Sequence, residues 1–161
     1  MEQTVRQQLS DYIVAHQEEF YRLAYSYVKN RDAALDVVQD TVVNAMTHAA
    51  SLKSEDAVKP WVYRILVNES LGYLRRSKRL VLMEETPEEV VYQEDVGERL
   101  DLCRAVDRLE PKLRTVVMLR FYEDMKLEDI ARITGANVNT VKSRLYKALE
   151  KLKKDIGCEI G

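Results

Sequence analysis

The sequence predicts an all-α protein in which two small helical domains are joined by an acidic flexible linker. Apolar residues recur at helical spacing along most of the 161-residue chain, and glycine and proline number only 5 and 3. Charge is segregated: the net charge is −2, but residues 84–101 hold eight acidic residues against one basic residue. We therefore expect domains over residues 1–79 and 98–161, with a linker over residues 80–97 that lets them move independently.

The first domain is predicted to contain four helices. They are expected around Tyr12, over Gln17–Val28, over residues 33–49 and over residues 61–78. Asp32 is a suitable N-cap for the third helix, and Pro60 suits the first turn of the fourth. The expected core stripe of the third helix consists of Leu35, Val38, Val42 and Met46, widened by Val43 and Ala45. The polar residues 51–59 show no helical period and are predicted to form a loop.

The second domain carries the pattern of a helix-turn-helix near its C-terminal end. Proline at position 111 opens a helix, and a short amphipathic helix follows over residues 127–133. Residues 134–137 form a turn, and a longer helix runs over residues 139–153. Gly135 supplies the backbone freedom that this turn needs.

The longer helix of this pattern has an apolar arc and an opposite basic arc. The apolar arc consists of Val141, Leu145, Ala148, Leu149 and Leu152. The basic arc consists of Asn139, Ser143, Tyr146 and Lys147, flanked by Lys142 and Arg144. Residues 137–154 hold six basic residues against one glutamate. An ordinary surface helix of a bundle is the alternative, but the turn, the helix length and the charge together favour entry into the major groove of DNA.

Two surfaces of the first domain also have a distinct composition. Asp36, Gln39 and Asp40 share one helix flank, which would either bind a basic partner or simply face water. From the spacing alone, solvation is the simpler interpretation. The helix over residues 61–78 ends in a basic run, and a basic helix with asparagine and tyrosine can follow phosphates and contact unstacked bases. Trp61 is expected in the core rather than as a base-stacking platform.

No catalytic site, metal site or cofactor is expected. His16 and His48 are isolated, and no glycine-rich phosphate loop is found. Cys103 and Cys158 are too few and too far apart for a disulfide framework or a four-ligand zinc site. The N-terminus lacks the layout of a secretory signal, and no apolar run of about 18 residues exists. These observations favour a cytoplasmic protein that is not an enzyme and has no small-molecule substrate.

At five short stretches the chain resembles bacterial sigma factors of the extracytoplasmic-function (ECF) type, the minimal branch of the sigma-70 family. These stretches are YRLAY at 21–25, DVVQD at 36–40, WVYRILVN at 61–68, EDIA at 128–131 and TVKSRL at 140–145. The resemblance covers about residues 18–77, which correspond to sigma region 2, and residues 101–154, which correspond to sigma region 4.

The resemblance implies three binding surfaces. Region 2 would bind the clamp of the largest subunit of core RNA polymerase through Leu35, Asp36, Gln39, Asp40 and Met46. It would recognise the promoter −10 element, where a base is flipped from the melted strand, through the loop 51–59 and Asn68, with Arg64, Arg75 and Arg76 alongside. Region 4 would dock on the polymerase flap and recognise the −35 duplex through Asn139, Thr140, Lys142, Ser143, Arg144, Tyr146 and Lys147.

The resemblance also implies partners. Core RNA polymerase and promoter DNA would be joined by an anti-sigma factor, which in this family is commonly bound to the membrane. The alternative function is a stand-alone helix-turn-helix regulator. The sigma-like stretch at residues 61–68 and the acidic helix flank at residues 36–40 are not needed by such a regulator, so their presence favours a sigma factor.

Overall fold

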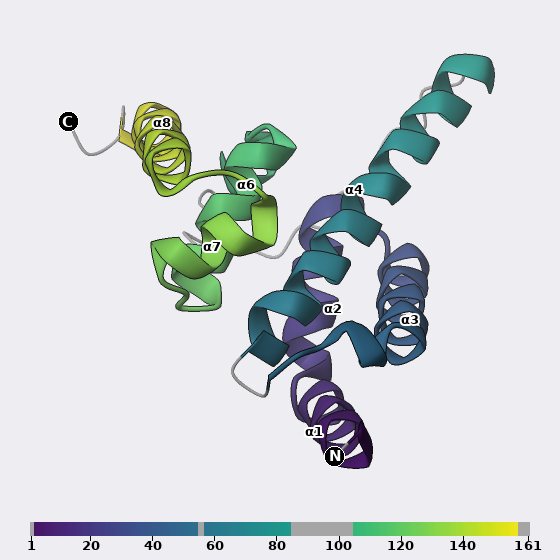
Figure 1. Ribbon diagram of the computed structural model, residues 1–161. Coiled ribbons are helices and arrows are strands. Elements are labelled where there is room, and N and C mark those ends of the chain that lie inside the picture. The colour runs from purple at the N-terminus through teal and green to yellow at the C-terminus, as the bar shows by residue number, and fades with distance from the viewer. Residues whose placement is uncertain (1, 55–56, 85–104, 158–161) are drawn as a thin grey trace.

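The computed structural model describes residues 2–54, 57–84 and 105–157, and every regular element in these ranges is helical (Figure 1). The first unit, residues 2–84, contains α1 (Glu2–Ala15), α2 (Gln17–Val28), α3 (Arg31–Thr47), the 3-10 turn η1 (Ala49–Ser51) and α4 (Val58–Glu84). The second unit, residues 105–157, contains α6 (Pro111–Val117), the π-helical turn η3 (Met118–Tyr122), α7 (Leu127–Thr134) and α8 (Val138–Gly157). The predicted all-α class is confirmed. None of the described helices is both long and apolar enough to cross a membrane.

The core of the first unit lies where α2, α3 and α4 pack against one another, with α1 against α3 and η1. Phe20 and Leu23 of α2 meet Tyr63 and Leu66 of α4, and all four side chains are buried. The rings of Phe20 and Tyr63 meet edge to face, with their centroids 5.3 Å apart. These positions follow the helical spacing that predicted α2, whose bounds agree with the expectation.

Helix α3 differs from the expectation in both its cap and its buried face. The cap is Asn30, whose Oδ1 accepts a hydrogen bond of 3.0 Å from the N–H of Ala33. Asn30 has extended backbone angles, whereas Asp32 already lies inside the first turn and cannot serve as the N-cap. The buried residues are Ala33, Ala34, Val37, Thr41 and Ala45. Leu35 and Val43, expected in the core, remain 43% and 65% exposed, because they lie away from this face when residues are placed at 3.6 per turn.

Helix α4 is longer than predicted at both ends. It begins at Val58, so only part of the segment 51–59 is irregular, and the buried Leu52 and Val58 anchor that segment. It continues to Glu84, so the first five residues of the expected linker are helical. Leucine, methionine and glutamate favour helix, and neither glycine nor proline occurs between Gly72 and Pro87. The remaining linker residues, 85–97, lie outside the described part of the chain.

In the second unit, α6 and α7 both pack against α8. Ile130 and Ile133 of α7 are buried, and α8 buries Val141, Ala148 and Leu152 as its apolar arc predicts. Leu145 of that arc is half-buried, and Leu149, at the edge of the packed face, remains 39% exposed.

In this structure the second unit docks on α2 and α4 (Figure 1). The expected independent movement of the two domains stays a prediction. Arg114 of α6 is buried and its guanidinium bridges the units. Nη1 donates to the backbone carbonyl of Ser26 at 2.9 Å, while Nη2 donates to the carbonyls of Asp107 and Leu109, both at 2.9 Å. The guanidinium also lies over the ring of Tyr27, 5.9 Å from its centroid.

Three further polar contacts hold the units together. The hydroxyls of Tyr27 and Thr115 are hydrogen-bonded, and burial raises the pKa of the Tyr27 phenol. Lys29 forms an ion pair with Asp107 at 2.8 Å. The Tyr63 hydroxyl donates to Oε2 of Glu123 at 2.8 Å. The two hydroxyl contacts join groups that would otherwise be buried without a partner, and the ion pair joins two half-buried side chains, so the docked arrangement is specific.

Replacing Arg114 with alanine should lower the free energy of unfolding by about 2–4 kcal/mol, because one buried and two part-buried carbonyls lose their donor. Equilibrium urea unfolding followed by circular dichroism measures this loss. The matched control is Arg108→Ala, which removes the same charge from an exposed side chain nearby. Equal stability of the two variants would contradict the bridging role of Arg114.

Glu123 should make stability depend on pH. Burial raises the pKa of its carboxyl above the ordinary 4.5, and Oε1 is buried without a hydrogen-bond partner. The stability that this group contributes is complete below 4.5 and is lost as the pH rises through the raised value. Glu123→Gln, which does not titrate, should therefore gain stability relative to the unmodified protein as the pH rises. Urea unfolding at stepped pH measures the difference, and the exposed Glu128→Gln is the control. If the free energy of unfolding varied with pH in the same way for Glu123→Gln and the unmodified protein, Glu123 would not be the source of the pH dependence.

Candidate nucleic-acid interface

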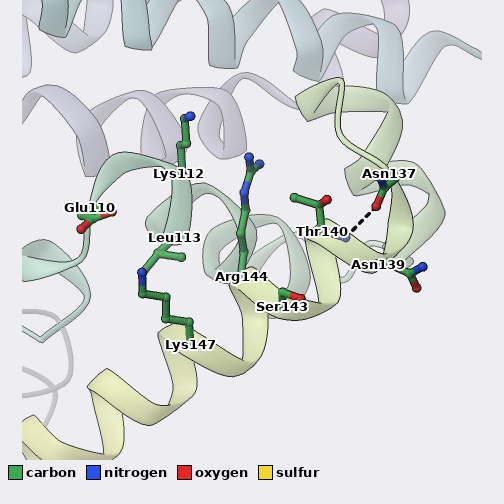
Figure 2. Close-up of a pocket in the computed structure, with 9 residues that line it drawn as sticks. All are labelled: Glu110, Lys112, Leu113, Asn137, Asn139, Thr140, Ser143, Arg144 and Lys147. Carbon is green, nitrogen blue, oxygen red and sulfur yellow. Dashed lines mark hydrogen bonds between the residues drawn. The ribbon is translucent and has the colours of Figure 1, made fainter.

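The turn between α7 and α8 is fixed by two short-range contacts. Gly135 ends α7 with φ of 71°, in the left-handed region, and its N–H donates to the carbonyl of Ala131 at 2.9 Å. Asn137 then caps α8, because its Oδ1 accepts from the N–H of Thr140 at 2.8 Å (Figure 2). The two caps set the direction of α8 relative to α7, which is the defining feature of a helix-turn-helix.

The structure brings all seven predicted −35 residues together on α8, away from its buried face. Five of them are exposed: Asn139, Lys142, Ser143, Tyr146 and Lys147. Thr140 and Arg144 are half-buried on the flank nearest α6. Tyr146 is 70% exposed, although a tyrosine ring is usually partly covered. An exposed helix face with amide, hydroxyl and cationic groups has the donors and acceptors that base edges in the major groove require.

The predicted −10 residues lie along the exposed side of α4. Arg64, Asn68 and Arg75 fall within an arc of about 40° when residues are placed at 3.6 per turn, and all three are exposed. Arg76 is exposed on the adjoining flank. Sequence reasoning missed Gly72, which is buried beneath this surface. A Cβ there would come within 3.3 Å of Arg76 Nη1 and 3.8 Å of Arg75 Nη2, so glycine lets both guanidinium groups lie close to the helix backbone.

The predicted polymerase-binding residues lie on one side of α3. Leu35, Asp36, Gln39 and Asp40 are exposed, whereas Met46 is half-buried. Sequence reasoning missed Val43, which it placed in the core, yet Val43 lies between these residues and is 65% exposed. Leu35 and Val43 together interrupt an otherwise acidic and polar surface. Exposed aliphatic side chains surrounded by polar residues are typical of a protein-binding surface.

Among the residues that the structure describes, no group of three or more histidine, cysteine or acidic side chains is placed to hold a metal ion. Cys103 and Cys158, which the sequence analysis judged unsuited to a zinc site, lie outside the described ranges.

Comparison with known proteins shows that the parts of the chain that carry these surfaces match two regions of one protein family. Residues 12–80 match the family described as Sigma-70 region 2, and residues 99–152 match Sigma-70, region 4. The chain is 42% identical to the RNA polymerase sigma factor SigV of Bacillus subtilis, covering 94% of this chain and 92% of that protein. It is 32% identical to the ECF RNA polymerase sigma-E factor of Haemophilus influenzae, covering 88% of this chain and 83% of that protein. The chain belongs to the ECF sigma factors of the sigma-70 family.

The solved structures agree with this assignment. The sigma factor RpoE of Bartonella quintana, crystallised with the anti-sigma factor NepR, superimposes on this sigma factor with a TM-score of 0.79 at 25% identity, covering 92% of this chain and 96% of that chain. The region 2 match excludes the alternative of a stand-alone helix-turn-helix regulator, because that match covers the whole segment from Tyr12 to residue 80.

Replacing Gly135 with alanine should destabilise this sigma factor by about 1 kcal/mol, because a Cβ is strained at positive φ even where space is open. Gly135→Asn should lose less stability than Gly135→Ala, since asparagine tolerates the left-handed region. Thermal and urea unfolding of both variants measure the difference. Equal stability of the alanine variant and the unmodified protein would show that α7 ends without the left-handed cap.

Proposed function

We propose that this sigma factor is the promoter-specificity subunit of RNA polymerase, which binds the core enzyme and directs initiation through the −10 and −35 elements. We assign region 2 to residues 1–79, region 4 to residues 98–161 and the connecting linker to residues 80–97. The observation that carries the proposal is the order of the region 2 and region 4 matches on one chain, each with an exposed surface of fitting chemistry.

The polymerase-binding surface of the proposal is the exposed side of α3. Asp36 and Asp40 supply negative charge for a basic partner, and Leu35 and Val43 supply apolar area that is desolvated on binding. The clamp of the largest polymerase subunit is the partner that the family resemblance implies. Met46 lies half-buried at the end of the same surface and adds apolar contact.

The −10 surface of the proposal is the exposed side of α4. Asn68 presents a side-chain amide, which offers both a donor and an acceptor to the edge of an unstacked base. Arg64, Arg75 and Arg76 lie along the same helix and supply the positive charge that holds the sugar–phosphate backbone of the melted strand. Base recognition and backbone attraction are thus divided between different residues of one helix.

The −35 surface of the proposal is the exposed side of α8, which enters the major groove. Asn139, Ser143 and Tyr146 lie at the centre of that side and are positioned to face base edges. Lys142 lies on a flank and carries a point charge without the two-pronged geometry of arginine, so it is suited to phosphate rather than to guanine.

Simultaneous recognition of both elements requires the two units to separate. Elements named for positions −10 and −35 lie about 25 base pairs apart, which is about 85 Å of B-form DNA. A compact chain of this length is only about 40 Å across. The contacts of Arg114, Lys29 and Tyr63 between the units must therefore break when the holoenzyme occupies a promoter.

The remaining parts of the proposal concern partners and location. The protein acts without catalysis of its own, in the cytoplasm, where core polymerase and the chromosome are found. The relative from Bartonella quintana was solved with an anti-sigma factor, and we propose that an anti-sigma factor, held at the membrane, also restrains this chain.

Replacing Asp36 and Gln39 with arginine should abolish binding to core polymerase, because like charges then face the basic partner. Co-migration with core polymerase on gel filtration and circular dichroism measure binding and helicity. The matched control is Gln7→Arg with Asp11→Arg, which places the same changes on the exposed side of α1. Full binding by the α3 variant, with helicity unchanged, would contradict the assigned surface.

Replacing Asn68 with alanine should relax base preference at one −10 position at a cost of about 1–3 kcal/mol, with little change in salt dependence. Arg64→Ala should instead weaken all promoters alike and reduce the salt dependence. Open-complex formation on promoters varied one base at a time, at several salt concentrations, separates the two. Uniform weakening by Asn68→Ala with a shallower salt slope would make Asn68 a backbone contact.

A further inference from the structure

A groove of about 420 Å³ lies between α6 and the flank of α8 that turns toward it. Three cationic side chains line it: Lys112 from α6, and Arg144 and Lys147 from α8. In Figure 2 the side chains of Lys112 and Arg144 extend side by side from the two helices in the same direction. Lys112 lies outside the helix-turn-helix, and no sequence pattern marked it.

The charge of this groove is not neutralised within the protein. Among the described residues, no hydrogen bond or ion pair joins Lys112, Arg144 or Lys147 to another group. The carboxylate at the groove is that of Glu110, which lies 3.7 Å from Lys151 instead. Arg144 is half-buried, and a partly desolvated guanidinium without a partner raises the free energy of the unbound protein. The groove therefore complements an anion.

The position of the groove identifies the kind of anion. An α-helix with its side chains is about 10–12 Å wide, and the major groove is about 12 Å wide, so a helix that fills it meets a sugar–phosphate backbone on each flank. At 3.6 residues per turn, Thr140, Arg144 and Lys147 lie roughly 100° from the centre of the side formed by Asn139, Ser143 and Tyr146. When that side faces the bases, the groove faces one strand.

We propose that the groove between α6 and α8 binds the sugar–phosphate backbone of one strand of the −35 duplex, with Lys112 as a direct phosphate ligand. This inference rests on the proposed −35 function of α8. Lys112, Arg144 and Lys147 then fix the position of α8 on the duplex without reading sequence, and base identity is read by Asn139, Ser143 and Tyr146.

The test uses the reconstituted holoenzyme and promoter fragments that differ only in the −35 element, titrated at several salt concentrations. Lys112→Ala should weaken binding to every fragment by the same factor, roughly five- to tenfold at about 0.1 M salt, and reduce the slope of log K against log salt by about one. Lys112→Arg should retain both values. Arg108→Ala, which removes one exposed charge outside the groove, should change neither.

Two results would overturn the inference. An unchanged salt slope for Lys112→Ala, while Lys142→Ala and Ser143→Ala weaken binding, would leave α8 as the −35 reader and remove Lys112 from the interface. An effect of Lys112→Ala confined to one −35 base pair would make Lys112 a base contact. If the unmodified holoenzyme did not discriminate among the −35 sequences, the proposed function of α8 would fail, whereas the Lys112 slope would still decide the backbone contact.

Discussion

The buried guanidinium of Arg114 is the interaction on which the arrangement of the two units depends. Nη1 and Nη2 find their acceptors only when the carbonyl of Ser26, from the first unit, lies beside those of Asp107 and Leu109, from the second. Arginine keeps its charge at any pH at which proteins fold, so it cannot relieve a missing acceptor by losing a proton. The docking of α6 on α2 therefore has one geometry, and the neighbouring contacts of Tyr27 and Lys29 follow from it.

The polar contacts in this interface are compatible with a protein that must open. When the units part, water can replace the partners of Lys29, Asp107, Tyr63 and Glu123, so these groups do not oppose separation as exposed apolar side chains would. The surfaces proposed for function lie elsewhere: the exposed residues of α3, α4 and α8 are accessible in the docked form. Docking therefore constrains the distance between the surfaces rather than covering them.

The sequence predicted the local structure better than the contacts between units. Helical spacing predicted α2 with its observed bounds and the buried arc of α8, since both depend on neighbours three or four residues away. The pairing of Tyr27 with Thr115 joins residues 88 positions apart, and no local pattern marks it. The prediction that Val43 lies in the core was wrong for a related reason. Hydropathy does not distinguish an apolar residue that packs within the chain from one on a surface that binds another protein. Lys112 was missed because its role depends on the side chains of another helix.

The distance between the units, measured in the free protein and in the promoter-bound holoenzyme, tests the central claim most directly. Spin labels at the exposed positions Val14 and Lys153, with Cys103 and Cys158 replaced by serine, allow pulsed electron–electron double resonance. The account predicts one narrow distance within about 40 Å in the free protein, the width of a compact chain. It predicts a distance longer by tens of Å on promoter DNA, where about 85 Å separates the two elements. The same short distance in both states would contradict recognition of the two elements by one chain.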